Sequence, residues 1–293
     1  METPYVVSYK LNMKTKILIA AIVSSCIMHH SSFAATTIDS ANRYAYGANL
    51  GWINGAGDTN HGAVIGEYVC SGYIYSANVG WISLGNGTPA DGIYYQNNSA
   101  ADFGVNQDGV GNLRGYAYGA NIGWLNFEST GAPKVDLASG NLSGYVWSAN
   151  CGWISLSNAV AYVQTDTIQK GALAPDGLPI AWLLQNFGTT NVNAGADPDH
   201  DGMNNLQEYL AGTDPNNGGD FLRITNVARA SVSTLLQWTA KPARFYSVQS
   251  RTALNSGSWD GFYSTALGAG ALTFNDTNTN DFFRVEAYRP LTP

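Results

Sequence analysis

One twelve-residue stretch gathers oxygen-bearing side chains at a spacing that could bind a metal ion. Carboxylates or amides stand at loop positions 1, 3, 5, 9 and 12, and Gly202 at position 6 permits a sharp turn. Calcium needs about six to eight hard oxygen ligands at once, and carboxylates crowded this closely repel one another without a cation. The predicted calcium ligands are Asp197, Asp199, Asp201, the backbone carbonyl of Met203, Asn205 and Glu208.

Short helices are expected on both sides of this loop. Residues 176–182 lead into a helix through Phe187, and a second helix spans 205–211 and ends before Gly212. The loop is of EF-hand type, and with its flanks it resembles the thrombospondin type 3 or dockerin-like calcium segments of bacterial secreted proteins. That resemblance implies a pair of loops. Here the upstream copy keeps one acidic ligand, Asp176, so we expect a single ion with a structural role.

Catalytic motifs are absent from the sequence. It has no Gly-x-Ser-x-Gly, no His-Glu-x-x-His and no phosphate-binding glycine loop, and only His61 and His200 lie beyond residue 34. Carboxylates that could hydrolyse glycosides are scattered through the repeats without a pattern. They are Asp58, Glu67, Asp91, Asp102, Asp108, Glu128 and Asp136. We therefore predict that the chain is not an enzyme, and a glycoside-acting enzyme is the third functional hypothesis.

Four internal repeats fill the first half of the chain, at spacings of 29, 43 and 29 residues. The copies run from Tyr44 to Asn54, Tyr73 to Ser83, Tyr116 to Asn126 and Tyr145 to Ser155. Their shared pattern, Gly-Tyr-x-Tyr-Ser-Ala-Asn-x-Gly-Trp-Ile, resembles units of bacterial surface and secreted proteins. Tyr-x-Tyr alternates with period two and Asn-x-Gly suits a tight turn, so each copy predicts a β-hairpin.

A third strand is expected before three of the hairpins, at 63–68, 103–107 and 134–137. The predicted domain is thus a set of three-stranded meanders, stacked or arranged radially. Its repeated tryptophans, Trp52, Trp81, Trp124 and Trp153, are expected to form the core that holds the repeats together. The alternative is an exposed aromatic platform on which sugar rings stack.

The cysteines beyond residue 34 are Cys70 and Cys151. A pair in an exported chain suggests a disulfide. Each of them, however, aligns with aliphatic residues of the sister repeats, so buried free thiols are the other possibility.

The C-terminal part returns to strands separated by turn residues, which is typical of a β-sandwich. Leu236-Gln-Trp238, then Pro242, then Phe245-Tyr-Ser-Val248 resembles two strands of fibronectin type III-like modules. The expected strands are 221–227, 235–239, 245–250, 259–264, 272–275 and 282–287.

The N-terminus has the layout of a secretory signal peptide. A basic segment from Met13 precedes an apolar run from Ile17 to Met28 and small residues ending at Ala35, and the run is too short for a transmembrane helix. Met13 is an alternative start, and Cys26 in a lipobox-like context is an alternative lipid anchor. Residues 1–34 hold three lysines and one glutamate, so the remainder carries a net charge of −9 rather than −7. Such an acidic chain disfavours nucleic-acid binding.

Together these patterns predict a mostly β, modular protein that is secreted or held at the cell surface. The expected parts are a signal peptide at 1–34, a four-repeat β domain at 36–165, a helical calcium-loop linker at 166–219 and an Ig- or fibronectin III-like sandwich at 220–293. The leading hypothesis is a structural or interaction protein with one structural calcium ion. The second is a carbohydrate-binding protein that uses the aromatic repeat face. An extracellular polysaccharide or another surface protein is the expected partner.

Overall fold

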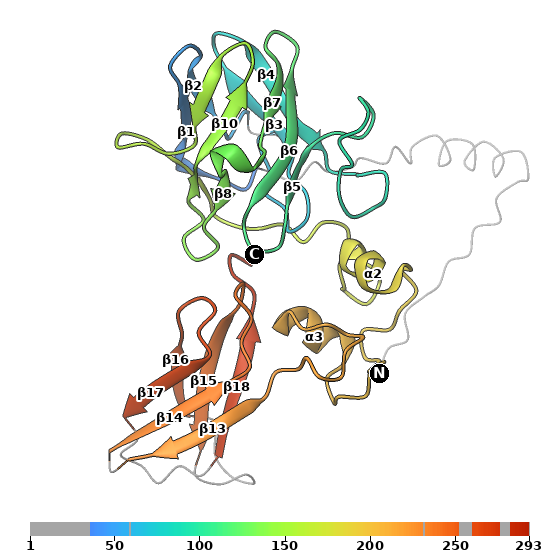
Figure 1. Cartoon of the computed structure of the whole chain (residues 1–293), viewed down its shortest axis with the longest axis vertical. Coiled ribbons are helices and arrows are strands. Elements are labelled where there is room, and N and C mark those ends of the chain that lie inside the picture. The colour runs from blue at the N-terminus through green and yellow to red at the C-terminus, as the bar shows by residue number, and fades with distance from the viewer. Residues whose placement is uncertain (1–35, 59, 231, 252–259, 276–281, 293) are drawn as a thin grey trace, which may run out of the picture. The chain divides into compact units, whose positions relative to one another are not determined.

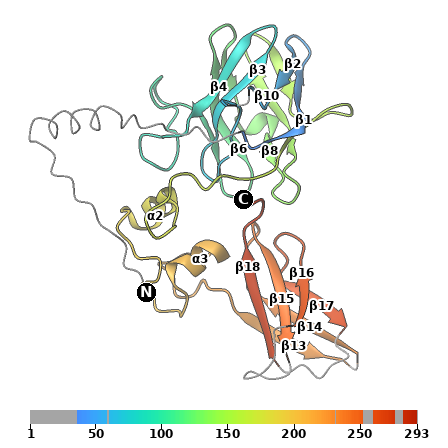
Figure 2. The same cartoon turned by 180° about the vertical axis from the view of Figure 1, so that it is seen from behind.

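The computed structural model describes residues 36–58, 60–230, 232–251, 260–275 and 282–292. The predicted signal peptide, the alternative start Met13 and the alternative anchor Cys26 lie outside these residues. The described chain is mostly β, as the sequence predicts (Figures 1 and 2). Within these ranges, no helix combines the length and apolar character needed to cross a membrane.

The four repeats form one sheet that closes on itself. Each repeat contributes one antiparallel hairpin, and the hairpins follow one another around the sheet until β11 pairs with β1. The strands are β1 (Ile38–Gly47), β2 (Gly51–Asn54), β3 (Ser71–Ser76), β4 (Gly80–Asn86), β6 (Leu113–Gly119), β7 (Gly123–Asn126), β10 (Tyr145–Ser148) and β11 (Gly152–Ser155). This closure removes free sheet edges among the repeats, which would otherwise be open to pairing with other chains.

The prediction of three-stranded meanders is confirmed only in part, because all four repeats share a two-stranded hairpin and only some of them have a third strand. Short strands do precede two hairpins: β5 (Val105–Gln107) pairs with β6, and β8 (Lys134–Val135) pairs with β9 (Leu142–Ser143). The expected strand at 63–68 makes only isolated bridges, of Val64 with Ser71 and of Gly66 with Gln169. A further strand, β12 (Val163–Thr165), pairs with β1.

The interior of the closed sheet is filled by aliphatic side chains in an alternating pattern of sizes. Ala45 and Ala117 face inward from the first and third hairpins, whereas Ile74 and Val146 occupy the same positions in the second and fourth. Equivalent residues of alternate hairpins, such as Tyr44 and Tyr116, are 72 residues apart. The sheet therefore consists of two copies of a two-hairpin unit, and alternation of small and large residues fills its narrow interior.

The tryptophans lie on the outside of the sheet, so the prediction that they form the core is wrong. Trp52, Trp81, Trp124 and Trp153 are each 44–47% exposed. In every hairpin the residue after the tryptophan is the one that faces inward, as Ile53 does after Trp52, because successive strand residues point to opposite faces. We call the outer rings, which also include Tyr46, Tyr75, Tyr118 and Trp147, the aromatic belt.

A ring of asparagine hydrogen bonds joins the hairpin turns at one end of the sheet. The side-chain amide of each asparagine donates to a backbone carbonyl in the turn of the neighbouring hairpin. The pairs are Asn78 to Leu50 (2.9 Å), Asn121 to Val79 (3.0 Å), Asn150 to Ile122 (2.9 Å) and Asn49 to Cys151 (3.2 Å). The last of these joins the first repeat to the fourth, so the ring closes where the sheet closes.

The C-terminal strands form two three-stranded sheets, β13-β14-β17 and β16-β15-β18, close to the positions that the sequence predicts. Leu236, Trp238, Tyr246, Val248 and Phe274 form their buried core. The strands are β13 (Ile224–Arg229), β14 (Ser233–Trp238), β15 (Phe245–Arg251), β16 (Asp260–Ser264), β17 (Ala271–Asn275) and β18 (Phe282–Tyr288).

Candidate metal centre and aromatic surface

The calcium loop predicted from the sequence brings three carboxylates together. Asp197, Asp199 and Asp201 each place an oxygen within 4.8 Å of the others. Backbone N–H groups within the loop orient these side chains: His200 donates to Asp197 Oδ1 (2.8 Å) and Met203 donates to Asp201 Oδ1 (2.8 Å).

The backbone has positive φ angles at loop positions 4 and 6, where the chain turns sharply. His200 has φ 63° and Gly202 has φ 97°, and the left-handed region suits a glycine at the second of these positions. The sulfur of Met203 accepts the N–H of Leu222 (3.3 Å). The backbone carbonyl of Met203, at loop position 7, is the group that the prediction assigns to the metal.

Four oxygens of this loop are buried without a hydrogen-bond partner. They are Asp199 Oδ2, Asp201 Oδ2, Asn205 Oδ1 and Glu208 Oε2. Both Asn205 and Glu208 have no exposed surface. Buried carboxylate oxygens without donors are costly, and a bound cation would satisfy them. Because all the available donors are hard oxygens, the set fits calcium better than a transition metal.

The surroundings of Glu208 disfavour its charged form in the absence of a cation. Burial, followed by the charges of Asp199, Asp201, Asp197 and Asp214, raises the pKa of Glu208 to about 7. The hydroxyl of Thr213 donates a long hydrogen bond (3.5 Å) to Glu208 Oε1. A divalent ion would reverse this balance, since it attracts the same negative charges that now repel one another.

Two helices hold the loop. Helix α2 (Ile180–Phe187) precedes it, and α3 (Asn205–Ala211) carries Asn205 and Glu208 in its first turn. Asn204 and Gln207 form a capping box at the start of α3, and Gly212 ends the helix in a left-handed conformation. The prediction of both helices is confirmed.

In the upstream loop, Asp176 has a structural role. Its Oδ2 accepts the N–H of Ala194 (2.7 Å), and its Oδ1 accepts the N–H of Leu178 at 3.5 Å. Asp176, the one acidic residue that the upstream copy keeps, therefore holds in place the segment that leads into the metal loop.

A buried charged cluster contacts the other side of α3. The hydroxyl of Tyr209 donates to Glu67 Oε2 (2.9 Å), which also pairs with Arg289 Nη2 at 2.7 Å. Arg244 donates to the carbonyls of Tyr209 (2.9 Å) and Leu210 (2.7 Å). Burial raises the pKa of Glu67, and the charge of Arg289 opposes that shift. No local sequence signal links residues 67, 209 and 289, so sequence reasoning missed this cluster.

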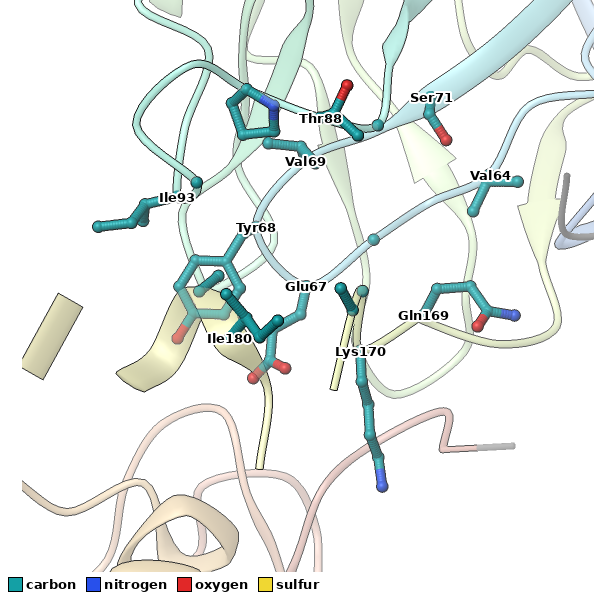
Figure 3. Close-up of a pocket in the computed structure, with 17 residues that line it drawn as sticks. Val64, Glu67, Tyr68, Val69, Ser71, Thr88, Ile93, Gln169, Lys170 and Ile180 are labelled. Carbon is teal, nitrogen blue, oxygen red and sulfur yellow. The ribbon is translucent and has the colours of Figure 1, made fainter. Parts of the chain in front are cut away.

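A cleft beside Glu67 is lined mainly by apolar residues (Figure 3). Val64, Tyr68, Val69 and Ile180 form much of its wall. Glu67 is its only carboxylate, and that group already pairs with Arg289. Lys170, Ser71 and Thr88 also line the cleft.

Most of the scattered carboxylates in the repeats serve turns. Asp58, Asp91, Asp102, Asp108 and Asp136 each accept two backbone N–H groups, nearly all of them two to four residues further along the chain. Asp102 is the exception, since it accepts from Ala90 and Gln96. These hydrogen bonds give each of the five aspartates a role in holding the backbone.

Within the aromatic belt, the two rings of each hairpin pack against each other at interplanar angles of 58–61°. Ring centroids lie 4.9 Å apart in Tyr46–Trp52, Tyr75–Trp81 and Tyr118–Trp124, and 5.0 Å apart in Trp147–Trp153. Such packing fixes each ring while leaving part of its surface open to solvent.

Two grooves open along the aromatic belt. The Trp124 groove is lined by Asn97, Asn98, Ser99, Ala100, Phe103, Tyr116 and Trp124. The Trp153 groove is lined by Asn126, Glu128, Thr130, Gly131, Trp147 and Trp153. Each groove thus combines aromatic walls with amide, hydroxyl or carboxylate groups, a composition typical of small-ligand sites.

Comparison with protein-family models, with curated proteins and with solved structures found no match. The resemblances to thrombospondin type 3, dockerin and fibronectin type III segments therefore stay predictions. The metal loop and the aromatic belt are the two features of the structure that indicate a function.

Proposed function

We propose that this protein binds saccharide chains in the grooves of its aromatic belt and that a calcium ion in the loop at 197–208 stabilises its linker. One observation carries the saccharide proposal: four tryptophans at equivalent repeat positions are 44–47% exposed. A protein that needed these rings only for packing would bury them, because large rings contribute stability through burial.

Sugar rings match such a surface chemically. One face of a pyranose ring is made of C–H bonds and stacks on an aromatic ring, while its hydroxyls need hydrogen-bonding partners at the edge. In the Trp124 groove, Asn98 and Ser99 lie beside Trp124 and Tyr116. Asn97 is held in place there, since its Oδ1 accepts the N–H of Gly104 (3.0 Å).

The calcium proposal rests on the four buried oxygens without partners. Asp197, Asp199, Asp201, Asn205 and Glu208 would hold the ion, with the carbonyl of Met203. The ion would supply charge compensation and no catalysis. Extracellular modules bind calcium with dissociation constants of about 10⁻⁴ to 10⁻³ M, close to ambient calcium outside cells. This fits the predicted export signal and a location in the medium or at the cell surface.

Affinity electrophoresis and calorimetry with a panel of soluble polysaccharides test the saccharide proposal. Trp124→Ala and Trp153→Ala should each weaken binding about tenfold, since a central aromatic anchor contributes more than about 1 kcal/mol. Trp52→Ala is the matched control, because Trp52 is equally exposed but lines neither groove. If no polysaccharide binds, the proposal is overturned and a protein partner becomes the leading hypothesis.

A further inference from the structure

The two grooves of the aromatic belt differ in charge. Glu128 is the only titratable side chain among the residues that line the Trp153 groove. The Trp124 groove offers amides and a hydroxyl, and of its lining residues only Tyr116 can ionise. Neither groove is lined by a lysine, an arginine or a histidine.

On the basis of the proposed function, we infer that the Trp153 groove takes a protonated amino sugar, such as a glucosamine unit of a β-linked chain. An ammonium group is attracted both by the face of an indole ring and by a carboxylate. Trp147 and Trp153 meet at 61° with their centroids 5.0 Å apart, so the groove has two indole walls beside its one carboxylate. A neutral sugar could only donate hydroxyl hydrogen bonds to Glu128, whereas an ammonium group also gains the attraction of opposite charges.

Local structure ties the backbone of Glu128 to the strand beside these walls. Its backbone N–H donates to Asn126 Oδ1 (2.6 Å), and Asn126 pairs with Trp147 across β7 and β10. The backbone of Glu128 is therefore held next to Asn126, the strand partner of Trp147.

A glycine brings the other side of the groove close. A side chain at Gly131 would overlap the carbonyl oxygen of Tyr145 and come within 3.1 Å of the Trp153 ring. Only glycine allows the turn Ser129–Gly131 to lie this near the rings.

Long-range electrostatics favours the same ligand. The chain has a formal net charge of −7, so a polycationic saccharide is attracted before it reaches the groove. The net charge would attract any cation to the protein, whereas the carboxylate of Glu128 would attract a cation only to the Trp153 groove. A point substitution therefore separates the two effects.

Calorimetry with two hexamers tests the inference: β-1,4-linked glucosamine and its fully N-acetylated counterpart, at about pH 6, where such amines are protonated. The native protein should bind the glucosamine hexamer more tightly. Glu128→Gln should weaken that binding about fivefold, since an exposed ion pair contributes up to about this factor. The acetylated hexamer should bind nearly as before, because the glutamine amide oxygen still accepts hydrogen bonds from sugar hydroxyls. Trp124→Ala should weaken the acetylated hexamer and preserve the effect of Glu128→Gln on the glucosamine hexamer.

Equal effects of Glu128→Gln on both hexamers, or no effect on either, would overturn the inference. If Trp124-dependent binding of the acetylated hexamer persists in that case, the proposed function stands. Oligolysine serves as a further probe: Glu128-dependent binding of oligolysine without binding of the glucosamine hexamer would point to a basic protein and would also overturn it. Because Glu128 is exposed, its glutamine variant should melt like the native protein, which confirms that folding is intact.

Discussion

At the scale of single residues, Cys70 and Cys151 occupy positions that are aliphatic in the other repeats. Cys70 is 1% exposed within the core of the closed sheet, and Cys151 lies in a hairpin turn, packed against that core. Both are free, so the structure agrees with the expectation from the sister repeats rather than with a disulfide. Burial raises the pKa of Cys70 to about 12.

We predict that iodoacetamide at about pH 8 modifies Cys151 in the folded protein and leaves Cys70 unmodified. Alkylation requires the thiolate, and a raised pKa keeps Cys70 protonated at this pH. Mass spectrometry of peptides from native and denatured samples measures both sites. Protection of both cysteines in denaturant without reductant would reveal a disulfide and contradict the structure.

Among the elements, the hairpin turns do more than reverse the chain. Each Asn-x-Gly turn places its glycine at φ 75–81°, and its asparagine amide donates to the turn of a neighbouring hairpin. The motif thus encodes both a hairpin and its attachment to a neighbouring hairpin.

Asn78→Ala should destabilise the closed sheet by about 1 kcal/mol, the usual net contribution of one hydrogen bond. Its amide donates to the carbonyl of Leu50, which joins the first two hairpins. Urea unfolding followed by tryptophan fluorescence measures the change.

Asn98→Ala, at an exposed position outside the ring, is the control and should change stability little. Replacing all four ring asparagines tests whether the bonds act together. A quadruple variant as stable as the native protein would show that the ring contributes nothing.

At the scale of the whole molecule, the metal loop and the buried cluster share one short helix. Glu208 of α3 faces the loop oxygens, while its neighbour Tyr209 contacts Glu67 and Arg289, residues far away in sequence. Stabilising α3 should therefore stabilise contacts well beyond the loop.

We predict that calcium raises the melting temperature of the protein relative to chelator. At a hundredfold excess over its dissociation constant, a ligand that binds only the folded state adds about 2.7 kcal/mol. For a unit as large as Ala34–Pro293 that corresponds to a rise of roughly 5–11 °C. Differential scanning calorimetry measures it.

The double variant Asp197→Asn with Glu208→Gln should abolish the calcium effect, because it removes two of the proposed ligands. Glu128→Gln removes a carboxylate elsewhere and should retain the effect in full. Identical melting of the native protein with calcium and with chelator would disprove the metal site.

Features with local geometry can be predicted from the amino-acid sequence. The proposed metal ligands lie within twelve consecutive residues, so their spacing alone predicts that they converge. The hairpins and both helices likewise follow from turn and capping residues adjacent to them. The mostly β composition and the C-terminal strands are predicted for the same reason.

Which face of each hairpin is buried depends, in contrast, on long-range contacts. A strand of alternating Trp and Ile has two apolar faces, and local pattern does not say which one points inward. Pairing of β11 with β1, residues more than 100 positions apart, closes a sheet whose interior fits Ala, Val, Ile and Leu, so the rings remain outside. The ion pair of Glu67 with Arg289 also could not be predicted, because the two residues are far apart in the sequence and no local pattern links them.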